Sequence, residues 1–325
     1  MKRHYTILLL LIFSLSSYAQ VEKTVIVEHF TNTRCSVCAA KNPAFYSIMD
    51  NYPQVLHIAY HPSSPYSTCV LSQHNPQEND SRANYYNLYG STPKLVLQGQ
   101  NVAVQTPLIT TDDIESQLGM TSDYKLSLVM TQISGDNYKV DLEVERASGN
   151  TTDDLVIYVG LAEKQLNYEA PNGEDVHFDV FRKMLTDESI SLSDVGEIKN
   201  YSLEFNMHSE WIVEEIFAYA IIQDANNKGV VQSGSSFQSP SAISNETIKE
   251  VSSIFYPNPS SGSVSIQSEY LNEIKKIEIY SMMGRKVKEI NKPNNLDIND
   301  LTVGMYFAKI TNHNNEIYST RLIKK

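Results

Sequence analysis

The sequence lacks the short motifs that mark several common classes of enzyme. It contains no glycine-rich phosphate-binding loop, no G-x-S-x-G motif of serine hydrolases and no H-E-x-x-H motif of metalloproteases. Its eight histidines do not fall into the closely spaced pairs that are typical of zinc sites. We therefore expect neither a bound metal nor a cofactor.

Basic residues are scarce, because 26 lysines and arginines stand against 38 aspartates and glutamates. The acidic excess is concentrated between residues 20 and 250, where 14 basic and 31 acidic residues give a net charge of −17. Such a charge repels phosphate groups, and this argues against a nucleic acid or an anionic membrane as partner.

The sequence has no apolar run long enough to span a bilayer. The apolar run near its start, Ile7 to Leu15, follows the basic stretch Lys2-Arg3-His4 and precedes the small-residue site Ser17-Tyr18-Ala19. This order is typical of a signal peptide, with a membrane anchor as the alternative. We predict a signal peptide over residues 1–19, a mature chain that begins at Gln20, and no transmembrane span.

Only three cysteines occur, and two of them, Cys35 and Cys38, are separated by two residues. A β-rich run over residues 24–30 precedes them, and a helical pattern over residues 42–49 follows. A cysteine at the start of a helix is favoured as the thiolate, and a second cysteine one turn away can close a disulfide. Arg34 adds positive charge beside the first cysteine. In an exported protein we expect the pair to rest as a disulfide.

The third cysteine, Cys69, lies in a long loop over residues 61–77 that contains several prolines and serines. An unpaired thiol in an exported chain is either a resolving or regulatory thiol for the other two cysteines, or a partly buried small residue. The sequence leaves both interpretations open.

The stretch around the first two cysteines resembles the active-site region of the thioredoxin-like superfamily. Pro43, five residues after Cys38, matches the proline that usually kinks the long helix of that family, and Ser91-Thr92-Pro93 resembles its threonine–cis-proline segment. The resemblance implies that Cys35 is the attacking thiol, that Cys38 resolves the mixed disulfide, and that Thr92 and Pro93 hold the substrate strand.

Two positions depart from the usual pattern of that superfamily. Arg34 stands where a tryptophan is usual, and Ser36-Val37 stands where Gly-Pro is usual. The resemblance also implies a buried acid that assists proton transfer, and Glu28 is the candidate by position. An exposed glutamate at the end of a strand is the alternative.

The elements predicted between residues 20 and 121 follow the thioredoxin order of strand, helix, strand, helix, two strands and helix. The predicted strands cover residues 24–30, 55–60, 94–98 and 102–104, and helices are predicted near residues 42–49, 78–89 and 111–118. Thr111 is predicted to cap the last helix, with Asp112 and Glu115 at capping-box spacing. We predict an α/β thioredoxin-like domain over residues 20–121.

From residue 122 onward the hydrophobic period changes to that of strands. Seven or so strands without a clear helix predict an immunoglobulin-like β-sandwich over residues 122–238. The pairing of the two domains resembles an exported outer-membrane protein family of Bacteroidota, through Glu28-His29-Phe30-Thr31, residues 176–185 and residues 224–232. This resemblance implies a surface or periplasmic location.

A serine-rich linker over residues 239–250 precedes a last unit, residues 251–325. Its blocks Phe255-Tyr256-Pro257-Asn258-Pro259, residues 277–287 and residues 296–310, and its basic end, resemble the C-terminal sorting domain of type IX secretion cargo. The resemblance implies a small β-sandwich that binds the type IX secretion machinery and is then cut off in the linker. A small appended binding domain is the alternative.

Two functions of different classes fit the sequence. The first is thiol–disulfide exchange with a protein or peptide substrate, in a secreted or cell-surface protein, through Cys35 and Cys38 with Arg34, Thr92, Pro93 and Glu28 in support. The second is a non-catalytic binding protein in which the disulfide is structural and the long loop and the sandwich bind a partner. The sequence leaves it undecided whether the protein is an enzyme.

Overall fold

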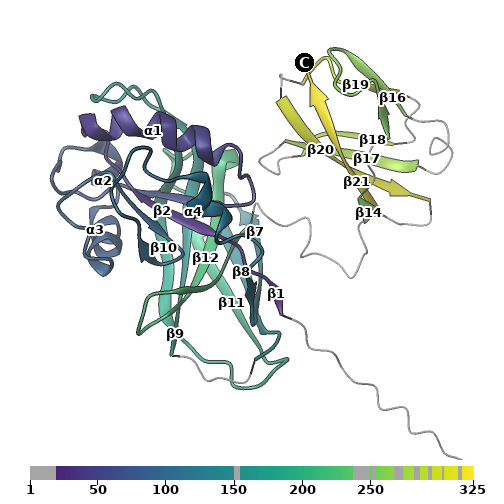
Figure 1. Ribbon diagram of the computed structural model, residues 1–325. Helices are drawn as coiled ribbons and strands as arrows, with labels where there is room; N and C mark the ends of the chain where they lie inside the picture. The colour runs from purple at the N-terminus through teal and green to yellow at the C-terminus, as the bar shows by residue number, and fades with distance from the viewer. Residues whose placement is uncertain are drawn as a thin grey trace, which may run out of the picture.

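The computed structural model describes residues 20–149, 154–236, 249–250, 254–266, 274–281, 286–291, 295–301, 304–313 and 317–325. The signal peptide and most of the linker lie outside these ranges. The protein is rich in β-structure, with several sheets and few helices, which confirms the prediction of a multi-domain β-rich chain (Figure 1).

The largest sheet has eight strands in the order β13-β12-β9-β10-β3-β2-β4-β5. In chain order its strands are β2 (Ile26–Phe30), β3 (Leu56–Tyr60), β4 (Lys94–Leu97), β5 (Gln100–Asn101), β9 (Leu155–Asn167), β10 (Val176–Ile190), β12 (Ile216–Asp224) and β13 (Val230–Ser235). Four of them come from the predicted first domain and four from the predicted second domain, so the sheet is continuous across the predicted boundary at residues 121 and 122.

The two halves of this sheet join where β3 and β10 run parallel, with Ala59 opposite Val180. A single hydrophobic core covers the junction on one face, and it contains Tyr60 from the first half and Phe181 and Tyr219 from the second half. The predicted domain limits remain a prediction, but the halves share both a sheet and a core.

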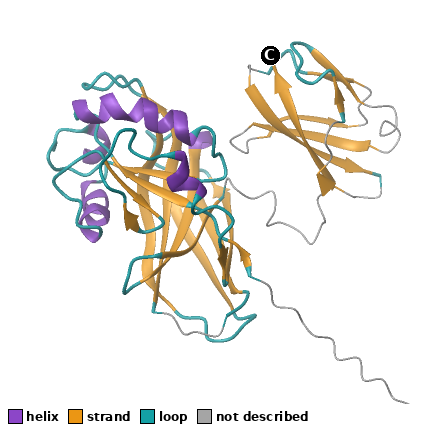
Figure 2. Cartoon of the chain, in the orientation of Figure 1, coloured by secondary structure: helices purple, strands orange, loops and turns teal. Residues whose placement is uncertain are grey.

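Helices cover the half of the sheet that is formed by residues before 121, and the other half has strands packed against it (Figure 2). The helices are α1 (Ser36–Met49), α2 (Val70–Gln73), α3 (Pro76–Tyr85) and α4 (Thr111–Glu115), with a short 3-10 helix, η1 (Val213–Glu215). On β2, Val27 packs in the same core cluster as Phe45 of α1 and Ile114 of α4, whereas Phe30 packs with Ala83 of α3. Because successive side chains of a strand point to opposite faces, α1 and α4 lie on one face and α3 on the other.

A three-stranded sheet, in the order β11-β8-β7, packs on the second half. Its strands are β7 (Tyr124–Ser134), β8 (Asn137–Arg146) and β11 (Ile198–Asn206), and a pair of short strands, β1 (Val21–Glu22) and β6 (Thr121–Ser122), lies at the start of this region. In β8, Val140, Leu142 and Val144 are buried and alternate with more exposed polar residues. This alternation is the one that the sequence predicts for a hairpin with one face toward solvent.

The C-terminal unit has two sheets with a hydrophobic core of their own. Their strands are β14 (Lys249–Glu250), β15 (Phe255–Tyr256), β16 (Ser263–Ile266), β17 (Ile274–Ser281), β18 (Lys286–Asn291), β19 (Asn295–Asp297), β20 (Gly304–Asn312) and β21 (Ile317–Lys324). The core includes Ile277, Ile279 and Ile310, which fits the blocks that define this unit in the sequence.

Three predicted boundaries of elements were wrong by a few residues. Helix α4 is capped by Thr110, whose capping box uses Asp113, and not by Thr111. Two adjacent threonines followed by acidic residues allow either register, so the sequence does not choose between them. Helix α3 begins at Pro76 after the cap Asn75, and the return strand is Gln100–Asn101 instead of residues 102–104.

The backbone of Gly99, in the first half of the large sheet, lies in close contact with the backbone of Lys228 in the second half. Its φ is +83°, and a Cβ added there would lie 1.8 Å from the Lys228 carbonyl oxygen. We expect Gly99→Ala to cost about 1–3 kcal/mol more free energy of unfolding than Gly119→Ala. Gly119 has a similar φ of +74° with nothing within 4 Å, so it carries the backbone penalty alone. Urea denaturation of both variants measures the difference, and equal losses would contradict the close contact.

Candidate functional site

Cys35 and Cys38 form a disulfide at the N-terminus of α1, with their Cα atoms 5.2 Å apart. Cys35 is the N-cap residue, and its sulfur accepts a hydrogen bond of 3.0 Å from the backbone N–H of Cys38. Unpaired N–H groups and the helix dipole favour negative charge at this position. The local geometry therefore stabilises a thiolate on Cys35 after reduction. Pro43 lies inside α1 at the position that the sequence indicated.

The proline segment lies against this disulfide. The Thr92–Pro93 peptide bond is cis, and the Cys35 sulfur is 3.6 Å from the Thr92 carbonyl oxygen. Pro93 is buried, and the Thr92 hydroxyl is buried without a hydrogen-bond partner among the described residues. The structure thus brings together four of the predicted site residues, namely Cys35, Cys38, Thr92 and Pro93.

Both sulfur-bearing residues are buried, since Cys35 is 1% exposed and Cys38 is 0% exposed. Arg34 is exposed, and its Nε donates a hydrogen bond of 2.9 Å to the Thr68 carbonyl oxygen in the long loop. Next to Thr68, the Cys69 sulfur is buried and lies 3.1 Å from the Thr33 hydroxyl. The long loop therefore packs directly beside the residues that precede Cys35.

The hairpin tip, residues 168–175 between β9 and β10, contacts the same place from the second half of the sheet. The side-chain N–H groups of Asn172 donate to the carbonyl oxygens of Asn32 and Cys35, and its backbone N–H donates to the Thr33 carbonyl oxygen. Glu174 accepts a hydrogen bond of 2.7 Å from Asn42 in the second turn of α1. Figure 1 shows this loop, in teal, alongside α1. The sequence analysis missed Asn172 and Glu174, and no local pattern marks them.

Glu28 does not lie with the cysteines but on the opposite face of β2 from α1. Its carboxylate is fully buried and forms an ion pair with Arg82 of α3, at 2.6 and 2.8 Å. Tyr86 donates to the same carboxylate, and Arg82 also donates to Gln223 of β12. The alternative of an exposed glutamate at the end of a strand is therefore wrong. Its predicted part in proton transfer remains a prediction, although all these partners lie away from α1.

The neighbour of Glu28 faces α1 instead. His29 is fully buried, packs against Phe45 with the two rings tilted and their centroids 4.6 Å apart, and has no hydrogen-bond partner on either ring nitrogen among the described residues. Burial lowers the pKa of His29 well below its usual range, and the nearby His57 and His61 lower it further. His29 is therefore a neutral imidazole inside the protein.

A second group of polar side chains begins at His57, whose ring centroid lies 5.7 Å from that of His29. Asp179 of β10 accepts a hydrogen bond of 2.8 Å from His57 and one of 2.7 Å from Lys164. Burial raises the pKa of Asp179, but Lys164 and His57 outweigh this effect and lower it. The backbone of Asp179 is left-handed, with φ +52°, which is unusual for a residue inside a strand. Because its pKa is lowered, the carboxylate of Asp179 stays ionised inside the protein.

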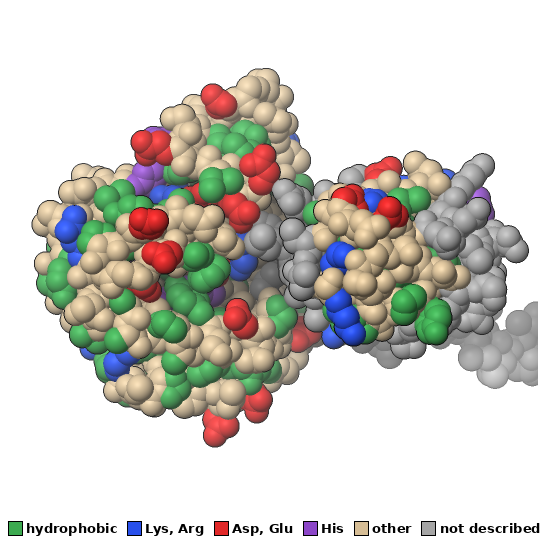
Figure 3. Space-filling model, turned by 90° about the horizontal axis from the view of Figure 1, so that it is seen from above, with side chains coloured by type: hydrophobic (Ala, Val, Ile, Leu, Met, Phe, Trp, Pro, Cys, Tyr) green, Lys and Arg blue, Asp and Glu red, His purple; other side chains and the backbone are tan. Residues whose placement is uncertain are grey.

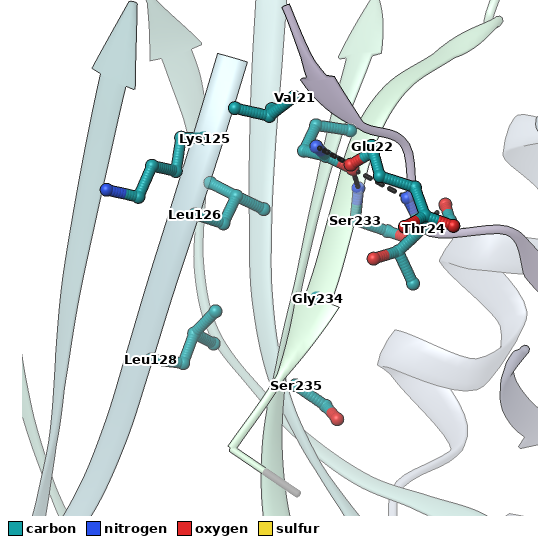
Figure 4. Close-up of a pocket in the computed structure, with 10 residues that line it drawn as sticks. Val21, Glu22, Thr24, Lys125, Leu126, Leu128, Ser233, Gly234 and Ser235 are labelled. Atoms are coloured by element: carbon teal, nitrogen blue, oxygen red, sulfur yellow. Dashed lines mark hydrogen bonds between the residues drawn. The ribbon is translucent and has the colours of Figure 1, made fainter. Parts of the chain in front are cut away.

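Several features elsewhere in the described residues do not add to this site. No group of three or more His, Cys, Asp or Glu side chains in those ranges could hold a metal ion, and none of the described helices is long and apolar enough to cross a membrane. A cavity of about 140 Å³ lies between the first strand and β7 and β13, lined by residues such as Val21, Leu126 and Ser233 (Figure 4). On the larger part of the molecule, which precedes the C-terminal unit, acidic and hydrophobic side chains are interspersed over the surface seen in Figure 3.

Residues 254–325 match the family model of the secretion system C-terminal sorting domain. The protein is type IX secretion cargo. It is therefore carried to the cell surface or secreted, as the sequence predicted, and the secretion machinery handles it through this domain.

A solved structure, HBP35 of Porphyromonas gingivalis, is similar to this chain with a TM-score of 0.57 and 16% identity, over 94% of this chain and 99% of that one. At this identity the likeness shows a common fold and says nothing of activity. A domain of the outer membrane lipoprotein Omp28 from Porphyromonas gingivalis has a TM-score of 0.26 and 14% identity, over 35% of this chain and 86% of that one. No curated protein matches this chain.

Proposed function

We propose that this protein exchanges disulfides with exported proteins or peptides through Cys35 and Cys38, held in a thioredoxin-like domain. The observation that carries the proposal is the placement of Cys35, which caps α1 and lies 3.6 Å from the carbonyl oxygen of Thr92, before a cis proline. A structural disulfide needs neither the helix terminus nor the proline segment.

The exchange begins with the pair oxidised. A substrate thiolate attacks the Cys35 sulfur, the Cys35–Cys38 bond breaks, and the Cys38 thiolate leaves and takes up a proton. A second substrate thiolate then attacks the substrate sulfur of the mixed disulfide and releases the Cys35 thiolate. The substrate dithiol loses two electrons and becomes a disulfide, and the cysteine pair gains them. The reverse sequence reduces a substrate disulfide. Isomerisation results when a different thiolate of the same substrate attacks the substrate sulfur of the mixed disulfide, which forms a new substrate disulfide and releases the Cys35 thiolate.

The second candidate is the structural disulfide in a non-catalytic surface protein. The burial of both cysteines supports it, because a sulfur that is 1% exposed is reached only after neighbouring groups move. In that case the ring closed by Cys35 and Cys38 adds about 2 kcal/mol to stability, as expected for so short a loop. The exposed Val37 and Val70 near the disulfide would then contact a binding partner.

The reduction potential of the pair separates the two functions. We expect the mature chain, residues 20–325, to equilibrate with glutathione buffers at a potential between about −120 and −270 mV, the range of known oxidoreductases. In Cys38→Ser the Cys35 thiolate should attack peptide disulfides, release one peptide thiolate and accumulate as mixed disulfides, while Cys35→Ser should not accumulate them. A potential below about −300 mV would assign the disulfide a structural role.

A further inference from the structure

The hairpin tip connects the second half of the protein to the cysteine pair through one asparagine and one glutamate. Asn172 donates to the Cys35 carbonyl oxygen at 3.2 Å and to the Glu174 carboxylate at 2.6 Å. A single side-chain amide therefore separates the carboxylate of Glu174 from the backbone of Cys35.

The other carboxylate oxygen of Glu174 is tied to α1. It accepts the hydrogen bond from Asn42, which is buried and lies four residues after Cys38. Residues four apart on a helix share a face, and their Cβ atoms are about 5–6 Å apart. Hydrogen bonds therefore hold the Glu174 carboxylate on two sides. Asn172 connects it to the backbone of Cys35, and Asn42 connects it to the helix turn that contains Cys38.

The negative charge of Glu174 is not neutralised locally. In the described part of the chain, no lysine or arginine lies within salt-bridge distance of it. Its partners are neutral amides, which orient the carboxylate without cancelling its charge. A carboxylate near a thiolate disfavours the thiolate, and the effect is larger in a partly buried site than in water.

Asn42 gives an independent reason to expect that the hydrogen bonds around the disulfide change when it is reduced. Its side-chain carbonyl oxygen is buried and has no hydrogen-bond donor among the described residues. Buried acceptors without donors are rare in folded proteins. Reduction creates an S–H group on Cys38, which lies one turn before Asn42 on the same face of α1 and adds a hydrogen-bond donor to that face.

We propose that Asn172 and Glu174 are positioning residues of the cysteine site, and that the charge of Glu174 limits how readily the Cys35–Cys38 pair is reduced. This inference rests on the proposed function where it concerns disulfide exchange. Its physical basis does not, because the charge of Glu174 acts on the reduced cysteines whether or not they react with a substrate. The second half of the protein thereby sets the reactivity of cysteines that belong to the first half.

Glu174→Gln tests the inference, because it removes the charge and keeps a side chain that can accept one hydrogen bond. In the mature chain we expect the equilibrium constant for reduction by glutathione to rise about tenfold, which corresponds to a potential about 30 mV less negative. At a pH below the pKa of the thiol, where little of it is ionised, the rate of alkylation of the reduced pair by iodoacetamide should rise by a similar factor, because removal of the charge increases the fraction of thiolate.

Glu169→Gln is the matched control. Glu169 is exposed on the same hairpin tip, so the variant loses the same charge away from the cysteines, and we expect it to behave as the unaltered protein. Asn172→Ala, which frees Glu174 from the Cys35 backbone, should change the potential in the same direction by a smaller factor. Circular dichroism confirms that each variant is folded.

The outcomes separate the two proposals. If Glu174→Gln and Glu169→Gln have the same potential and the same alkylation rate, the role of Glu174 is overturned. If Glu174→Gln raises the equilibrium constant for reduction tenfold but the potentials of both the variant and the unaltered protein lie in the structural range, the role of Glu174 stands and the exchange function fails.

Discussion

Replacing Arg82 with methionine is expected to lower the free energy of unfolding by about 3–5 kcal/mol, the usual cost of removing one partner from a buried ion pair. Arg82 is 3% exposed and Glu28 is 0% exposed, so the variant leaves a carboxylate inside the protein without a cation. The guanidinium of Arg82 also lies 4.3 Å from the ring centroid of Tyr158, and this cation–π contact is lost as well.

Chemical denaturation of the mature chain measures the loss, and Lys199→Met is the control. Lys199 and Glu188 form an ion pair in which the side chains are 38% and 47% exposed, and pairs of this kind contribute about 0–1 kcal/mol. The double variant Glu28→Gln, Arg82→Met should be more stable than Arg82→Met alone, because no unpaired charge remains. If Arg82→Met costs no more than Lys199→Met, the buried ion pair does not stabilise the junction.

The same double variant tests the predicted catalytic part of Glu28. If Glu28 only stabilises the fold, the variant should exchange disulfides at the unaltered rate under conditions in which it is folded. If the rate of disulfide exchange falls but its dependence on pH keeps the same shape, the substitution has damaged the site. A changed dependence of the rate on pH would assign Glu28 to proton transfer.

Lowering the pH from 7 to 5 is expected to cost about 4 kcal/mol of stability through two buried histidines, about 2 kcal/mol from each. Burial lowers the pKa of His29 and of His61 well below 6.5, and neighbouring histidines, with Arg182 in the case of His61, lower it further. The unfolded chain binds these protons near pH 6.5 and the folded chain does not. Stability is therefore complete above pH 6.5 and falls as the pH decreases below it.

Urea denaturation at intervals between pH 7 and pH 5 measures this slope, to which the lowered pKa of His74, about 4, also contributes, and His29→Leu should remove about 2 kcal/mol of the loss. Because neither ring nitrogen of His29 has a hydrogen-bond partner among the described residues, this variant should be at least as stable as the unaltered protein at pH 7. The carboxylate of Asp179 does not complicate the result, because its lowered pKa lies below this range of pH. A flat stability between pH 7 and pH 5 would contradict the burial of neutral histidines.

Much of the fold was predictable because local patterns determine it. The alternation in β8 predicted one buried face, the stretch that precedes Cys35 predicted a strand, and the cysteine spacing predicted a helix start. The blocks of residues 251–325 predicted the sorting domain, which the family match over residues 254–325 confirms.

The remainder depends on contacts between residues that are far apart in the chain. Glu174 lies 132 residues after its partner Asn42, and the pairing of Val180 with Ala59 joins two regions whose strands each look complete on their own. A polar hairpin tip such as Asn172-Gly173-Glu174 looks like any solvent-exposed turn in the sequence. The face that Glu28 occupies follows from the register of β2, and a shift of one residue would have exchanged it with His29.

The parallel junction of β3 and β10 also limits how this protein can have evolved. Without β10, strand β3 would be an edge strand with unpaired backbone groups, and exposed edges promote aggregation. Either half, inherited alone, would have to acquire a new way to protect that edge. A chain divided between the two halves would therefore expose the edge of β3 in one fragment and the edge of β10 in the other.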